Sequence, residues 1–354
     1  MSGLIGHTTY AMLAAKAAAY RQLPVSPIIE RHYASYLAGS YLGSDIQTLP
    51  EAVCVDTGQE VGYGTVPLEK SPITGGAVRR WKLEVDGKSY SPRDIHTLFY
   101  GRAHIVFGWR GEDKRHAIAW EDIPDYIASV VDDAIGFFGP SHRQLAYIFG
   151  WATHVVGDSL IKSVHPGLHL HLIDGQYTPR NRPIQDLVTF HEVGRRELGL
   201  NWPALLHDLA KTPVEPVQVH YMRCREKSGR LGAHFPDGWQ PDKEKLLRLV
   251  LAKNREYEAK RTSGILKDMA LSKGPDGTLN CSPELSARTG GLSYQEMIEA
   301  ADKANFRHVL WEMGEAIADL FENVVGLQAY LQEMPSSVSD PTWGVLSKRW
   351  KKEE

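Results

Sequence analysis

The sequence has few cysteines, no long hydrophobic run and almost no net charge. Of its 354 residues three are cysteine, Cys54, Cys224 and Cys281, and no two of them form a CxxC pair. This excludes a disulfide-stabilised scaffold and favours a reducing compartment, so we expect a cytoplasmic protein. No stretch of about 18 apolar residues occurs, and no membrane span is expected.

The charge balance excludes further classes of protein. The 40 Lys and Arg residues are matched by 43 Asp and Glu, which leaves a formal charge of −3. Such a balance argues against a dedicated binder of nucleic acid or anionic membranes, since these need a clustered positive surface. Residues 8–23 are rich in alanine, but Lys16 interrupts them and no basic segment precedes them. They predict an amphipathic helix rather than a signal peptide.

Helical periodicity dominates the chain. Pro24 and Pro27 interrupt a helical pattern in the first 45 residues, and short β-type runs follow between about 50 and 110, where VDGKSY carries an Asp-Gly hairpin signal. Further helices are predicted over 122–138, 142–164, 184–198, 242–272 and 293–332. We therefore predict a mostly α protein, a helical bundle with a small β insertion. Its core would span 1–225, and 226–354 would form a helical extension packed on that core.

Histidine is abundant and gathers with a carboxylate at one place. The chain has 15 histidines, and the segment GWATHVVGDSLIKSVH puts His154 and Asp158 four residues apart. On a helix these two side chains lie on the same face, one turn apart. His165 follows where Pro166 should end the helix. An imidazole and a carboxylate in this arrangement can hold a cation, and a carboxylate can bridge two cations.

This segment resembles the central helix of the zinc-dependent phospholipase C and single-strand nuclease superfamily. The shared pattern is Gly-Trp followed by His-x-x-Gly-Asp, with a later histidine. Other elements of the family follow the same order along the first 200 residues of this chain. They match His7 in GHTTY, Asp45 in LGSDI, His104 in RAHIVF, with His96 as the alternative, and His191 in TFHEVG.

The resemblance implies an all-α fold with a cleft that binds up to three zinc ions. Carried over to this sequence, one ion would take Asp45, His104, His154 and Asp158; a second would take His165, His191 and a glutamate; and a third would take His7, Asp158 and N-terminal backbone atoms. The family places that glutamate four residues after the late histidine, where this chain has Arg195. Glu192, Glu197, His207 and Asp208 are the candidates to replace it, and a site with one or two metals stays open.

The expected function is hydrolysis of a phosphoester by metal-activated water. Zinc neutralises phosphate oxygens and makes hydroxide available near neutral pH, and Asp45 could orient the attacking water or accept its proton. The residues do not separate phospholipid, nucleotide and small phosphodiester substrates, and a small soluble phosphoester is favoured over lipid. Arg102, Arg180 and Arg182 are candidates for holding the phosphate. His and Asp ligands also suit iron or manganese.

A second constellation competes with this interpretation. LLHDLAKT contains the adjacent His207 and Asp208, and EAADKAN supplies Asp302. These strings resemble the HD phosphohydrolases, which bind one or two metals on a helical bundle; the upstream ligand would be His165, His169 or His171. On this interpretation the protein is an HD-type phosphohydrolase or oxygenase. A metal enzyme of non-phosphate chemistry, such as a non-phosphate hydrolysis or an elimination, and a non-catalytic metal-binding protein are further alternatives.

Overall fold

The fold is mostly α-helical, as predicted, with small antiparallel sheets. A computed structural model describes residues 4–41, 49–62, 69–71, 74–95, 98, 142–161, 181–211 and 242–322. The helix predicted over 122–138 lies outside these ranges. Within them, no helix is long and apolar enough to cross a membrane.

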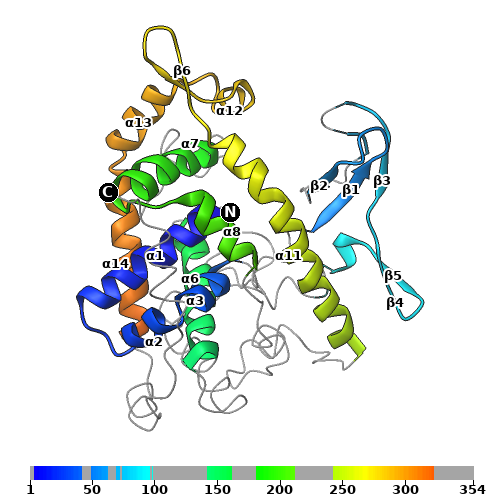
Figure 1. Cartoon of the computed structure of the whole chain (residues 1–354), viewed down its shortest axis with the longest axis horizontal. Coiled ribbons are helices and arrows are strands. Elements are labelled where there is room, and N and C mark those ends of the chain that lie inside the picture. Colours follow the sequence, from blue (N-terminus) through cyan, green and yellow to red (C-terminus); the bar gives the residue numbers. More distant parts are fainter. Residues whose placement is uncertain are drawn as a thin grey trace, which may run out of the picture.

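The first helix, α1 (Leu4–Tyr20), lies at the centre of the helical body (Figure 1). The predicted helix is present, but it starts four residues earlier than expected and is buried on nearly every side; Lys16, Ala19 and Tyr20, near its end, are exposed. The prolines then interrupt the helical pattern as expected, and α2 (Ser26–Arg31) begins with Pro27 in its first turn. Short α3 (Tyr33–Ser40) follows.

Helix α6 (His142–Ile161) crosses α3 with their backbones in contact. A β-carbon added to Gly150 would lie 1.8 Å from the carbonyl oxygen of Tyr36, and one added to Gly39 would lie 2.1 Å from that of Tyr147. Both positions therefore require glycine. Glycine inside a helix costs about 0.5–1 kcal/mol relative to alanine, and here the close packing of the two helices offsets that cost.

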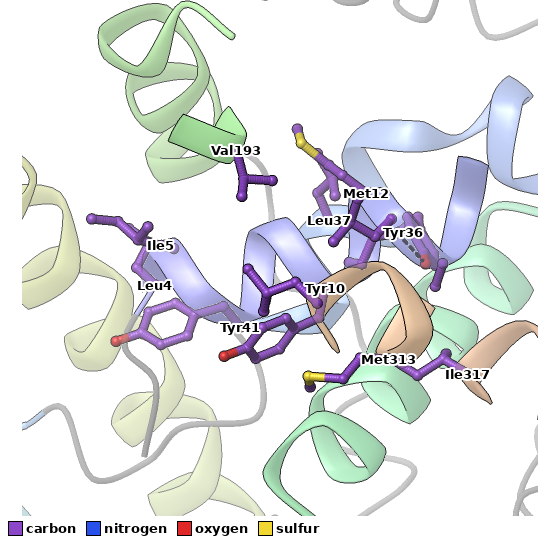
Figure 2. Close-up of a cluster of buried hydrophobic side chains, with 14 of the residues drawn as sticks. Leu4, Ile5, Tyr10, Met12, Tyr36, Leu37, Tyr41, Val193, Met313 and Ile317 are labelled. Carbon is purple, nitrogen blue, oxygen red and sulfur yellow. Dashed lines mark hydrogen bonds between the residues drawn. The ribbon is translucent and has the colours of Figure 1, made fainter. Parts of the chain in front are cut away.

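Helices α13 (Tyr294–Lys303) and α14 (Phe306–Glu322) belong to the same hydrophobic core as α1 and α6. They confirm the helical prediction for this region up to residue 322. Met313 and Ile317 of α14 pack near Tyr10 of α1, as Figure 2 shows. Arg21, just after α1, forms ion pairs with three carboxylates of α14, which fix the ends of the two helices to each other: Glu315, Asp319 and Glu322.

Three shorter helical segments lie between residues 181 and 211. Helix α7 (Asn181–Val188) continues directly into η4 (Thr189–Glu197), whose hydrogen bonds follow the wider π pattern, and α8 (Trp202–Lys211) comes next. A helix was predicted over 184–198, but its π geometry was not. Trp202 stacks on Phe190, and its indole N–H donates to the Phe190 carbonyl at 3.0 Å. Long π segments are rare and are frequent at functional sites.

The predicted β insertion is present as two small antiparallel units. Strand β1 (Pro50–Cys54) is flanked by β2 (Glu60–Gly62) and β3 (Val78–Arg80). Strands β4 (Leu83–Val85) and β5 (Lys88–Tyr90) form the predicted Asp-Gly hairpin. Its turn residues Asp86 and Gly87 have φ angles of 51° and 75°, the left-handed conformation that a tight two-residue hairpin turn requires.

The long helix α11 (Asp242–Asp268) separates the helical body from the strands β1–β5 (Figure 1). Its first half packs against the β insertion in a second, smaller core that is distinct from the main one; this core contains Leu49, Val85, Ile95, Leu246, Leu247, Val250 and Leu251. Toward its other end, Ile265 and Leu266 pack against the main core. The helix thus joins the two cores, while the predicted boundary near residue 225 lies outside the described part of the chain.

The segment after α11 differs from the prediction. The helix expected to reach residue 272 ends at Asp268, and a hairpin of β6 (Ser272–Lys273) and β7 (Leu279–Asn280) follows. The signal for this hairpin is the Pro-Asp-Gly turn, in which Asp276 accepts hydrogen bonds from Thr278 and Gly277 has a φ of 83°. Helix α12 (Pro283–Arg288) then leads to α13, whose first turn carries a capping box of Ser293 and Glu296.

Candidate metal centre

The structure brings two of the predicted metal ligands into direct contact. His7 lies near the start of α1, and His154 lies in the middle of α6, 147 positions later in the sequence. Their imidazole rings stack with centroids 3.9 Å apart and planes inclined by 17°. Both side chains are buried, with exposed fractions of 1% and 0%. Two histidines that the resemblance assigned to one cleft are therefore neighbours.

A glycine allows α1 to approach α6 at this point. A β-carbon on Gly157 would lie 2.9 Å from the ring of Tyr10 and 3.8 Å from Nδ1 of His7. Tyr10 meets the His7 ring edge to face at 5.9 Å, and Tyr41, just after α3, lies 6.1 Å from it. The hydroxyl groups of the two tyrosines point to the same side in Figure 2. Gly157 belongs to the family-like motif, and its small size gives His7 and Tyr10 their place.

A backbone hydrogen bond fixes the orientation of His154. Its Nδ1 lies 2.8 Å from the carbonyl oxygen of Ser40, the last residue of α3. A carbonyl can only accept, so Nδ1 carries the proton and, in the neutral ring, the lone pair is on Nε2. Histidines that bind metals commonly have this arrangement, with one nitrogen held by a backbone carbonyl and the other available to the metal. The contact depends on the glycine crossing of α3 and α6, which brings Ser40 to His154.

The remaining ligands of the predicted set lie largely outside the described residues. Asp158 follows His154 by one turn of α6, but its side chain is not among those described. Outside the described ranges fall Asp45, His96, His104, His165, His169, His171, Arg102 and Arg180. Arg182, a candidate for holding phosphate, lies on α7 and pairs with Asp186 at 3.9 Å. Among the described residues, no group of three or more His, Cys, Asp or Glu side chains is placed to hold a metal ion.

His191 lies on η4, where its surroundings are different. Its Nε2 donates to the carbonyl of Met269 at 2.7 Å, and its ring contacts Phe190 and Tyr294. Burial lowers the pKa of this imidazole, while the hydrogen bond to Met269 opposes the shift. Because Nε2 carries the proton, Nδ1 has the lone pair of the neutral ring. His191 therefore has one nitrogen that suits a metal, on a different element from the His7–His154 pair.

The two glutamates near His191 already have protein partners. Glu192 is buried and accepts hydrogen bonds from the Tyr294 hydroxyl at 3.0 Å and from Arg196 at 2.8 Å. Burial and the neighbouring Glu192 carboxylate raise the pKa of Tyr294. Glu197 accepts from Arg307 at 3.3 Å and from the indole of Trp311 at 3.2 Å.

The competing His-Asp pair lies on α8. The side chain of His207 is half-exposed, and its Nδ1 lies 3.4 Å from Oδ1 of Asp208. Asp302, the proposed distal ligand, is on α13 and pairs with Arg307 at 2.9 Å. The two adjacent residues thus contact each other, while Asp302 is held by an arginine.

Sequence reasoning missed the residues that position the histidine pair. Ser40 acts through its backbone carbonyl, so no side-chain pattern indicates it. Tyr10 could have been found, because it follows His7 by three residues and so shares its helix face. Tyr41 comes close to His7 only through the crossing of α3 and α6.

No protein family, curated protein or solved structure matches the chain.

Proposed function

We propose that the protein is a metal-dependent hydrolase, with zinc as the preferred metal, that cleaves a phosphoester. The observation that carries this proposal is the buried His7–His154 pair, because distant parts of the chain meet at two residues that the family resemblance singles out, His154 in the central motif and His7 as a separate match. The orientation of His154 by the Ser40 carbonyl supports it further, since a proton on Nδ1 puts the lone pair of the neutral ring on Nε2, as in many metal-binding histidines.

The described donor atoms fit metal binding. His7, His154 and the Asp158 one turn later would hold the metal, together with Asp45, His104 and His165 if the resemblance extends to them. Coordination bonds to imidazole lie in the plane of the ring, and the rings of His7 and His154 are nearly parallel. Their lone pairs therefore do not converge on one point, which favours separate ions over one shared ion. When bound, zinc lowers the pKa of a coordinated water to about 7.

The chain itself would contribute positioning and exclusion of water. The stacked histidines are buried, and Tyr10 and Tyr41 lie against the ring of His7. Asp45 is the residue that we assign to orienting the attacking water or accepting its proton. We infer a small soluble phosphoester as substrate and a cytoplasmic location. The free thiols of Cys54 and Cys281 support a reducing compartment.

Elemental analysis of protein purified without chelators and without a histidine tag tests the proposal. We expect two or three zinc ions per chain, lost in His154→Ala and retained in His308→Ala, a half-exposed histidine of α14 that serves as the matched control. Asp158→Ala should lose more than one equivalent if this carboxylate bridges two ions. Zinc that is present in His154→Ala at the wild-type level would contradict the proposal, as would a loaded protein that turns over no phosphodiester or phosphomonoester.

An HD-type metal enzyme is the second candidate, favoured by the contact between His207 and Asp208. It predicts iron or manganese that is lost in His207→Ala and retained in His154→Ala. The same set of variants thus separates the two functions.

A further inference from the structure

The hydroxyl group of Thr8, which follows His7 on α1, is buried. Thr8 is fully buried, and within the described part of the chain its Oγ1 has no hydrogen-bond partner. The next residue, Thr9, is equally buried, but its Oγ1 donates to the Ile5 carbonyl at 2.9 Å, the usual way in which a helix satisfies a threonine. A buried hydroxyl without a partner is costly, so Thr8 indicates a ligand that completes the site.

The position of Thr8 near the start of α1 favours a negatively charged ligand. Side chains of an α-helix lean toward its N-terminus, so the Thr8 side chain leans toward the first turn, where Leu4 and Ile5 are also buried. The N–H groups of a first turn point out of the helix end and make it the positive end of the helix dipole. The first turn of α1 contains no acidic residue that would neutralise this end. These donors suit an anion.

We propose that Thr8, together with the first turn of α1, binds the phosphate group of the substrate. The inference rests on the proposed function and deepens it, because it assigns a phosphate-binding residue to α1, the helix that carries the candidate ligand His7. The Thr8 hydroxyl donates to a phosphate oxygen. Thr8 is thus a substrate-binding residue for a phosphate-bearing ligand.

Calorimetric titration of the purified protein with inorganic phosphate tests the inference without relying on turnover. Thr8→Val removes the hydroxyl at nearly constant volume, and Thr9→Val is the matched control, since it removes a hydroxyl that bonds to the helix itself. We expect Thr8→Val to weaken phosphate binding by about tenfold, as for a lost hydrogen bond to a charged group, and Thr9→Val to change it less than about twofold. Thr8→Ser should bind nearly as well as the wild type. Metal content should be unchanged in all three variants.

Two outcomes would overturn the inference. Phosphate that binds the wild type and Thr8→Val equally would show that other groups hold it, and a wild-type protein that binds no phosphate would show that the Thr8 hydroxyl serves no such ligand. If either result accompanies hydrolysis of a phosphodiester, the subsite is wrong and the proposed function stands. If Thr8→Val weakens phosphate binding in a protein that hydrolyses no phosphoester, the subsite stands and the proposed function fails.

Discussion

The helical body and the β insertion use different means to hold their elements together. In the body, Gly39 and Gly150 let the backbones of α3 and α6 touch, and this contact leaves no room for one additional methyl group. The β insertion instead packs a few side chains of its strands onto the first half of α11, in a small core of its own. An ion pair between Asp86 of the hairpin turn and Lys245 of α11 adds to that contact.

This difference matters because the described part of the candidate metal centre, the His7–His154 pair, lies in the first region. The glycine crossing brings the Ser40 carbonyl to His154, and Gly157 brings His7 to the same place. Tight packing fixes side chains within the narrow tolerance that a functional site needs. A small separate core on one helix can open without disturbing that site, since local stability need not be uniform. We therefore expect the two regions to respond differently to mutation.

The largest effect is expected for Gly150→Ala. The new β-carbon would overlap the Tyr36 carbonyl oxygen, and no side-chain rotation can relieve a clash with the backbone. We expect a loss of at least about 3 kcal/mol in the free energy of unfolding, measured by urea denaturation. Gly264→Ala, on α11, is the matched control: nothing lies within 4 Å of its added β-carbon, so we expect a gain of about 0.5–1 kcal/mol. Equal effects at the two positions would contradict the close crossing.

A second prediction asks whether the two cores unfold separately. Leu247→Ala removes a fully buried side chain from the small core and should cost about 2–4 kcal/mol there. Hydrogen exchange should then show faster exchange of the amides in β1–β5, while those of α1 and α6 keep their protection. Leu310→Ala, in the main core, should instead weaken protection across α1, α6 and α14 together. Loss of protection throughout the chain in Leu247→Ala would show one cooperative unit.

The smallest effect concerns pH. Burial and the neighbouring Arg31 lower the pKa of His142, whose Nδ1 lies 3.4 Å from that guanidinium. As pH falls through about 6.5, the unfolded chain takes up a proton that the folded protein resists, so folding stability decreases toward acid pH. In His142→Gln, the difference in urea stability between pH 7.5 and pH 5.5 should shrink by less than about 1 kcal/mol, because His142 is partly solvated. His308→Gln is the control, and an equal change there would contradict the assignment.

The sequence predicted the elements well where local patterns decide them. The Asp-Gly turn of β4–β5, the proline breaks before α2 and the apolar periodicity of α13 and α14 all depend on neighbouring residues, and the structure confirms them. The π geometry of η4 was missed, since it is associated with the packing of Trp202 against Phe190 rather than with a local signal. The β6–β7 hairpin was missed although its Pro-Asp-Gly turn was readable.

For the candidate site, the sequence alone determined which residue types could bind a metal and that His154 and Asp158 share one helix face, because helix geometry fixes neighbours four residues apart. It could not determine that His7 stacks on His154, that the Ser40 carbonyl sets the proton position on His154, or that Thr8 and Thr9 differ in their hydrogen bonding. Those relations join residues that are distant in sequence or depend on backbone atoms. The tertiary structure decided them, through the close approach of α1, α3 and α6 that three glycines permit.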